Sequence, residues 1–169
     1  MNKNLWIIDQ EHSKINFSVK HLMISKVRGH FDRFSGTWLF DPEDLSSSKI
    51  EATIETGSVN TNDKTRDQYL KGPEFFNSEK YPTIYFRSIW IEIGENKQLR
   101  VAGELTLHGI TRPVLFNVKG NVKEGTTIQT EIKRNDFKLN WSSLMESGGI
   151  LVGDEVSVEL NVQWIKQES

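Results

Sequence analysis

Apolar and polar residues alternate with a period of two along most of this 169-residue chain. The alternation is clean in five segments, at 15–20, 50–55, 100–107, 128–133 and 156–163. It is the pattern of a strand with one wet face and one dry face. Three further segments, 29–40, 83–93 and 113–120, predict strands less cleanly. About eight strands joined by short, turn-rich loops are typical of an antiparallel barrel or sandwich, so the predicted fold class is all-β.

Two segments depart from this alternation. The stretch HLMISKVRG places apolar residues at helical spacing before a glycine, which predicts a short helix at about 21–28. In the longest connection, a Thr61 or Asn62 cap and a following Gly-Pro pair predict a helix at about 63–71. The apolar residues after that helix would form a lid or plug.

Composition narrows the class of protein. A chain of this length suggests a single domain, residues 1–169, that buries its own core. The chain has no cysteine, which excludes disulfides and thiolate chemistry. A net charge of −2 creates no basic field for nucleic acid. Neither a signal-like stretch nor the ~20 apolar residues of a membrane span is present, so we expect a cytoplasmic protein without membrane insertion.

The histidines are candidates for chemistry, but their settings favour structural roles. His108 precedes Gly109 between two alternating strands, where the pair suits a tight hairpin turn at the rim of the fold. His12, His21 and His30 are evenly spaced, yet no close histidine pair backed by carboxylates suggests a metal site. Motifs of activated serines, dinucleotide sites and phosphate loops are also absent. We therefore expect no catalytic residue and no metal.

Two arginines need an explanation. Arg66 lies on the second predicted helix, where it either anchors the helix to the barrel wall or meets an anionic head group. Arg134 ends an alternating strand and needs a partner if it points inward, because a buried unpaired charge is costly. Asp136, on the same side by alternation, is the expected partner.

The aromatic residues leave two interpretations open. Nine Phe, five Trp and three Tyr either fill a solid core or line a cavity. An eight-stranded barrel has just enough interior for side chains or for one small ligand. An apolar ligand needs only an apolar tube, and each buried CH₂ is worth about 0.8 kcal/mol. The candidate lining residues are Phe17, Val19, Leu22, Phe34, Trp38, Ile54, Leu70, Phe75, Phe76, Ile84, Phe86, Leu105, Phe116, Trp141 and Val158.

Several segments together resemble a known family. They are WIIDQEHSKINFSVKHLMISKVRGHFDRF, RDQYLKGPEFFNSEKYPTIYF, LTLHGITRPV, KRNDF and VGDEV, and they span nearly the whole chain. In this order and spacing they resemble the YceI-like family of polyisoprenoid-binding proteins. The resemblance implies a lipocalin-like antiparallel barrel of eight strands whose apolar channel holds an isoprenoid or another long-chain amphiphile. It also implies a homodimer and no catalysis.

The resulting hypothesis is non-enzymatic binding, transport or storage of a long-chain lipid, with no other cofactor. His21, Arg66 and Tyr69 are the candidate head-group contacts near the mouth. Tyr69 departs from the family pattern, in which a histidine is frequent at this position. The alternatives are an isomerase or hydrolase of lipophilic substrates within the barrel, and a solid-core, stress-related interaction module. The enzyme would need a histidine and a carboxylate that converge inside the channel.

Overall fold

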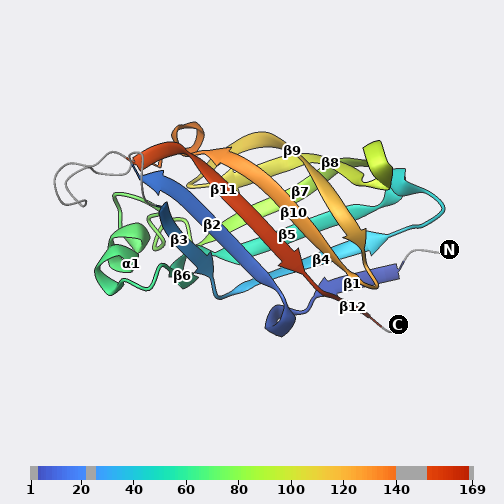
Figure 1. The fold of residues 1–169 in the computed structure, drawn as a ribbon, viewed down its shortest axis with the longest axis horizontal. Coiled ribbons are helices and arrows are strands. Elements are labelled where there is room, and N and C mark those ends of the chain that lie inside the picture. The colour runs from blue at the N-terminus through green and yellow to red at the C-terminus, as the bar shows by residue number, and fades with distance from the viewer. Residues whose placement is uncertain (1–3, 22–25, 140–151, 168–169) are drawn as a thin grey trace.

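The structure is a computed structural model that describes residues 4–21, 26–139 and 152–167. In this part of the chain, twelve strands form one antiparallel sheet (Figure 1). The strands are β1 Asn4–Ile8, β2 Lys14–His21, β3 Lys26–Phe31, β4 Phe34–Phe40, β5 Lys49–Glu55, β6 Val59–Asn60, β7 Thr83–Ile93, β8 Leu99–Leu107, β9 Ile110–Asn121, β10 Gly125–Lys133, β11 Val152–Val162 and β12 Trp164–Lys166. The helices are α1 Lys64–Lys71 and the short 3-10 turns η1 Gln10–His12, η2 Leu45–Ser47, η3 Thr56–Ser58, η4 Glu95–Lys97 and η5 Arg134–Phe137.

The sheet closes on itself as a barrel. Its strand order is β12-β1-β4-β5-β7-β8-β9-β10-β11-β2-β3-β6, and β11 and β12 are separated only by Gln163. The amide of Asp9 donates to the carbonyl of Gln163 at 2.8 Å, and the amide of Gln163 donates to the Ser13 hydroxyl at 2.9 Å. These bonds join the β2–β11 part of the wall to the β1–β12 part.

Some strands continue directly into the next one after a short break, so the twelve strands make up eight long strands of the barrel wall, called paths below. These eight paths correspond to the eight segments expected from the sequence. Three paths are interrupted: β1 and β2 by η1, β3 and β4 by two residues, and β11 and β12 by Gln163. The side-chain carbonyl of Gln10 accepts from the amide of Phe34 at 2.8 Å, and its NH₂ group donates to the carbonyl of Asp32 at 3.1 Å. This side chain thus ties two of the breaks together. The eight-stranded antiparallel barrel is therefore confirmed, with β6 as a two-residue addition.

The helix expected at 21–28 is wrong. His21 ends β2, and Lys26 begins β3, while residues 22–25 lie outside the described part of the chain. Val27 is buried and pairs with Val19 across the two strands. The pairing of β2 with β3 outweighs the helical preference suggested by the local spacing. In the sheet, the residues of these strands gain backbone hydrogen bonds and side-chain contacts across the strands.

The second helix is confirmed as α1, at one end of the barrel (Figure 1). Its N-cap is Asp63, not Thr61 or Asn62, and the Asp63 carboxylate accepts from the amide of Arg66 at 3.0 Å. Thr61 instead holds the helix to the wall, because its amide and hydroxyl donate to the Asp67 carboxylate at 2.9 and 2.6 Å. Gly72 is the C-cap, as the sequence predicted.

The expected hairpin at His108 is also confirmed. His108 and Gly109 join β8 to β9 with φ angles of 57° and 73°, the combination of a type I′ turn. The turn is fixed from two sides. His108 Nδ1 lies 3.0 Å from the carbonyl oxygen of Phe137, and its ring stands edge-on to Tyr81 at a centroid distance of 5.2 Å. His108 is thus a turn residue that supports η5.

We expect Gly109→Ala to destabilise the fold by about 1–2 kcal/mol, because a left-handed conformation costs an L-residue about this much. A Cβ at this position would also lie 2.6 Å from the Tyr81 ring. Urea unfolding of the variant measures the change. Gly57→Ala is the matched control, since a Cβ there meets no atom within 4 Å. Equal stability of the two variants would contradict the role of the turn.

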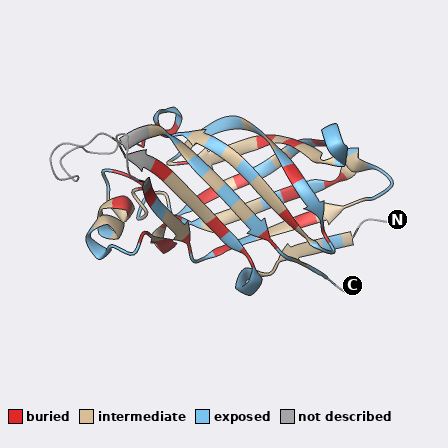
Figure 2. Ribbon diagram, viewed as in Figure 1, coloured by how far each residue is buried: buried red, intermediate tan, exposed pale blue. Residues whose placement is uncertain are grey.

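Buried residues recur along the strands of the wall, between intermediate and exposed ones (Figure 2). They form two clusters along the barrel. One cluster lies at the α1 end and includes Leu70, Phe75 and Phe76. The other is built around Trp38 and packs against Trp6 of β1 and Trp164 of β12, two strands that lie away from α1 (Figure 1). The space between these clusters is the candidate site.

Candidate ligand channel

An apolar cavity of about 220 Å³ occupies the interior of the barrel. Its wall is contributed by inward-facing side chains of nearly every long strand, together with residues from the α1 segment. Alternation explains the apolar lining, because successive side chains of a strand point to opposite faces. Atoms that face unfilled space lose dispersion contacts, so a cavity of this size favours an apolar occupant.

The cavity runs between the two clusters. At the α1 end it is lined by Leu70, Phe75 and Phe76, and at the other end by Trp38 and Trp164. The lining side chains thus belong to both ends of the barrel and to the strands between them. The cavity therefore reaches residues of both clusters.

The end of the channel that is lined by Trp38 and Trp164, called the tryptophan end below, is filled by aromatic rings and buried valines. Trp38 is 1% exposed, and its ring stands edge-on to Phe40 and Trp164 at centroid distances of 5.5 and 5.4 Å. The indole N–H of Trp164 donates to the Thr126 hydroxyl at 2.9 Å, which fixes that ring. The Trp38 indole N–H has no hydrogen-bond partner among the described residues. Among the described residues, those that line this end include buried rings but no charged side chain.

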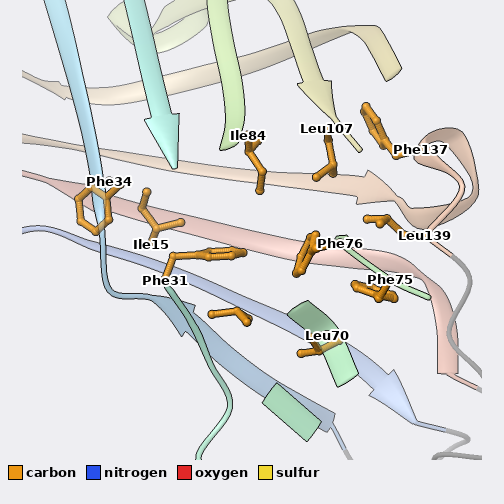
Figure 3. Close-up of a cluster of buried hydrophobic side chains, with 11 residues drawn as sticks. Ile15, Phe31, Phe34, Leu70, Phe75, Phe76, Ile84, Leu107, Phe137 and Leu139 are labelled. Atoms are coloured by element: carbon orange, nitrogen blue, oxygen red, sulfur yellow. The ribbon is translucent and has the colours of Figure 1, made fainter. Parts of the chain in front are cut away.

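The α1 end combines apolar residues from segments far apart in the sequence (Figure 3). Phe75 and Phe76 follow α1, and their rings stand edge-on with a centroid distance of 4.9 Å. Phe76 also contacts the Phe31 ring of β3 at 5.9 Å. Phe137 and Leu139, from η5 and the residues just after it, complete this end (Figure 3). The α1 segment therefore covers one end of the channel, as the sequence predicted for an apolar plug.

Arg134 stands out in this apolar surrounding. It begins η5 directly after β10, is only 8% exposed and lines the cavity. Its Nη1 donates to the carbonyl of Leu139 at 2.7 Å. Burial lowers the pKa of Arg134, while the charges of Asp154 and Tyr69 act in the opposite direction. An arginine remains protonated in such a setting, so a buried positive charge lies beside the channel, whose own surface is apolar.

The expected pairing of Arg134 with Asp136 is wrong. Asp136 is exposed, and its backbone carbonyl accepts from Arg112 Nε at 3.1 Å. The carboxylate that acts on Arg134 is that of Asp154, which also accepts from the amide of Asn135 at 2.9 Å. The reason is the η5 turn, which ends the alternation at Arg134 and so removes the basis for placing both residues on one side.

Most of the candidate lining residues also border the cavity in the structure. They are Phe17, Val19, Trp38, Ile54, Leu70, Phe75, Phe76, Ile84, Phe86, Leu105, Phe116 and Val158. Phe34 is buried in the cluster at the α1 end but is not a lining residue. Leu22 and Trp141 lie outside the described residues.

The three expected head-group residues are not brought together in the lining. Arg66 forms an ion pair with Asp63 at 3.8 Å and is not among the residues that line the cavity. Tyr69 packs against the cluster at the α1 end, with its ring 6.4 Å from that of Phe75, and acts electrostatically on Arg134. The side chain of His21 lies outside the described part of the structure.

The other described histidines lie away from the channel. His12 is exposed and bonds Asp9 at 2.7 Å, and this carboxylate raises the pKa of the imidazole. His30 pairs with Asp32 at 2.9 Å on the outside of the barrel. Within residues 4–21, 26–139 and 152–167, no group of three or more His, Asp or Glu residues is placed to hold a metal ion. No helix of this part is both long and apolar enough to cross a bilayer.

Comparison with known proteins places the barrel in a family. The sequence model of the YceI-like domain matches residues 6–164. The chain belongs to the YceI-like family. Among its relatives, the UPF0312 protein SA2479 of Staphylococcus aureus is 34% identical over 166 residues, which cover 92% of this chain and 94% of that protein.

Solved structures show the same YceI-like barrel. BcnA of Burkholderia cenocepacia matches with a TM-score of 0.80 at 25% identity, over 92% of this chain and 98% of that one. The YceI protein of Campylobacter jejuni matches with a TM-score of 0.71 at 30% identity, over 89% and 90%. A polyisoprenoid binding domain from Saccharophagus degradans has a TM-score of 0.75 over 96% and 98%. At 18% identity, this last likeness shows the fold alone.

Sequence reasoning missed part of the lining. Trp164 was not among the expected lining residues, yet it lines the cavity next to Trp38. Val114, Val118 and Ile128 also line the cavity. Their alternation with polar neighbours could have identified them, because Val114, Phe116 and Val118 share one face of β9.

Proposed function

We propose that this protein binds a long-chain isoprenoid or a similar amphiphilic lipid in the barrel, as a carrier or store and not as an enzyme. The apolar tail would lie along the cavity, with its end at Trp38 and Trp164. The head group would lie at the α1 end, near Arg134 and Tyr69. Every long path of the wall contributes apolar surface to the tail, so a tail of many CH₂ groups gains about 0.8 kcal/mol for each group buried.

The continuous apolar cavity between the two clusters is the observation that carries this proposal. A solid-core interaction module would fill this space with side chains. Membership of the YceI-like family supports the same function, and a structural neighbour of the same fold is described as a polyisoprenoid binding domain.

The arrangement of titratable groups favours binding over catalysis. General acid–base chemistry on a lipophilic substrate needs a proton-handling group within hydrogen-bond reach of the substrate. Among the described residues that line the cavity there is neither a histidine nor a carboxylate. The ion pairs His12–Asp9 and His30–Asp32 do bring such groups together, but outside the channel.

Native mass spectrometry before and after organic extraction tests the proposal. The purified protein is expected to carry an added mass of a long-chain lipid, which extraction removes and which incubation with a C20 or longer prenyl lipid restores. A protein that never carries or takes up such a lipid would refute lipid binding.

Ala52→Phe is expected to block the channel without placing a charge in it. Ala52 lines the cavity and pairs with Phe86 across β5 and β7, so an added ring would occupy the path of the tail. We expect lipid uptake to fall by about tenfold or more, since the ring excludes several CH₂ groups. Thr53→Phe adds the same ring on the outer face of β5 and should bind like the wild type. Equal uptake by both variants would argue against an internal binding site.

Two further expectations remain predictions. The resemblance implies a homodimer, and the sequence suggests a cytoplasmic protein. Sedimentation of the purified protein and cell fractionation measure these properties independently of ligand binding.

A further inference from the structure

We propose that the lipid tail enters and leaves the channel sideways, through the wall between β9 and β10. The inference rests on the proposed function and specifies the route of the ligand into the same cavity. Pairing of these two strands begins at Asn121 and Gly125, next to the turn that joins them, and stops at Val118 and Ile128. In the described wall, residues 113–117 of β9 and 129–133 of β10 lie beyond the last pair and are not paired with each other. This part of the wall is called the window below.

Both strands continue along the window, and each is paired on its other side. β9 pairs with β8 as far as Ile110, and β10 pairs with β11 as far as Lys133. The register of the paired part, if continued, would place Phe116 opposite Thr130. Backbone partners are thus present on both sides but are not joined. The strands can therefore part at the window without breaking a hydrogen bond between them, whereas parting β8 from β9 would cost such bonds.

Pro113 gives a physical reason for the unpaired edge. It lies opposite Glu104 of β8, and because proline has no N–H, this pair is not a hydrogen-bonded one. The alternation of an antiparallel strand then directs the backbone groups of Pro113, Leu115 and Asn117 toward β10. Lys133 lies on the β10 side of the window. Proline and lysine are residues that keep strand edges from pairing, so the sequence itself disfavours closure of this part of the wall.

The window borders the cavity directly. Its inward side chains line the cavity from both strands, namely Val114, Phe116, Thr130 and Ile132. All four are only partly buried, whereas Val118, in the paired part of β9, is 1% exposed. The inner face of the wall thus becomes accessible where the pairing of β9 with β10 ends.

Contacts at both of its ends limit the window. One end is the last pair of the two strands, Val118 with Ile128. At the other end, Arg112 Nε donates to the carbonyl of Asp136 at 3.1 Å and so ties β9 to η5. The five residues between these contacts span roughly 16 Å of strand. A flexible chain that lies along the strands can pass through an opening of this length.

The two ends of the barrel offer a more difficult route. At the α1 end, Phe75, Phe76 and Phe137 are buried in one cluster. At the tryptophan end, the rings of Trp38 and Trp164 stand edge-on to each other. A tail that entered through either end would have to displace packed side chains, which costs their dispersion contacts.

A cross-link across the window tests this route. The chain has no cysteine, so Leu115→Cys combined with Glu131→Cys places the only two thiols on the outer face, one on each side of the window. A short bismaleimide then joins the two strands. Uptake of a fluorescent C20 prenyl lipid, and its release to acceptor vesicles, are measured with and without the link. We expect the link to slow both rates by about tenfold or more, because it closes the gate. The equilibrium affinity should change by less than about threefold, since a route alters both rates alike.

The matched control joins two strands that are already paired. Gln129 and Glu159 are exposed and lie opposite each other on β10 and β11. The same reagent on Gln129→Cys with Glu159→Cys should leave both rates unchanged. Wild-type rates in protein cross-linked across the window would overturn the proposed route. Protein without a link that never takes up the lipid would instead refute the proposed function.

Hydrogen exchange of the wild type gives a decision without any cross-link. The amides of Leu115 and Asn117 face the window, whereas those of Val114 and Phe116 face β8, with which β9 is paired. We expect the first two amides to exchange at least about tenfold faster than the other two in lipid-free protein. Equal protection of all four amides would show that β9 and β10 are joined, and would overturn the window.

Discussion

Replacing Phe86 by Asp should abolish lipid uptake. Phe86 is 8% exposed, lines the channel as a member of the cluster around Trp38, and lies against Phe116 with a centroid distance of 5.2 Å. An ionised carboxylate here would have to lose its hydration when a lipid tail passes, at a cost of several kcal/mol. We expect at least about a hundredfold loss of affinity, measured by titration of extracted protein with a fluorescent prenyl probe.

The control for this variant lies on the same strand. Ile89 is 55% exposed on the outer face of β7, so Ile89→Asp introduces the same charge outside the channel and should leave affinity unchanged. Circular dichroism shows whether each variant keeps its β structure. A folded Phe86→Asp protein with wild-type affinity would mean that the ligand does not pass Phe86. If the variant does not fold, Ala52→Phe still tests the same stretch of the channel.

Trp38→Ala should cause the largest loss of stability. The Trp38 ring is 1% exposed, and it contacts Phe40 and Trp164. Removing it opens a cavity at the tryptophan end that the surrounding strands fill only in part, because Trp38 pairs with Trp6 and Ile50 in fixed register. Substitutions of this kind cost about 3–5 kcal/mol. Chemical denaturation of extracted protein measures the loss.

Trp38→Phe tests whether the packing of the ring or the indole N–H contributes more to stability. The indole N–H of Trp38 has no hydrogen-bond partner within the described residues, so its removal leaves no other group unpaired. We expect Trp38→Phe to cost about 1 kcal/mol, far less than Trp38→Ala. Similar losses for both variants would show that a contact of the N–H contributes to stability, and would contradict the packing explanation.

Long-chain ligands should also respond to the space that Trp38→Ala creates. The tail end of the channel is bounded by Trp38 and Trp164, which would set the longest chain that fits. Trp38→Ala protein that remains folded offers additional apolar surface, and each extra CH₂ that enters the enlarged cavity gains about 0.8 kcal/mol. The tryptophan end thus connects core packing with ligand length.

Periodicity in the sequence identified the main features of the wall. Alternating segments such as 100–107 and 156–163 became β8 and β11, because a strand in a half-buried sheet has to present its apolar side chains to one face. The same reasoning singled out residues such as Phe17, Phe86 and Val158, which border the cavity. β1 was missed, since its sequence NLWII is apolar without alternation. The short strands β6 and β12 were missed because two or three residues show no period.

Local sequence patterns gave wrong predictions where contacts between distant segments determine the structure. The helical spacing at 21–28 did not prevail against the pairing of Val27 with Val19. Arg66 and Tyr69 are close in sequence to the apolar plug, which made both candidates for the head group. In the structure, Tyr69 packs against the cluster at the α1 end, whereas Arg66 pairs with Asp63 and does not line the cavity.

By itself, the sequence determined the class of the fold, its eight strand paths and the apolar character of its interior, because period-two patterning and turn residues are local properties. Only the tertiary structure decided that Trp38 and Trp164 meet at one end and that Arg134 lines the other. Arg134 belongs to a turn that ends the alternation, and Asp154, which acts on it, comes from a distant strand. The closure of the barrel brings such residues together, and no pattern within one segment encodes it.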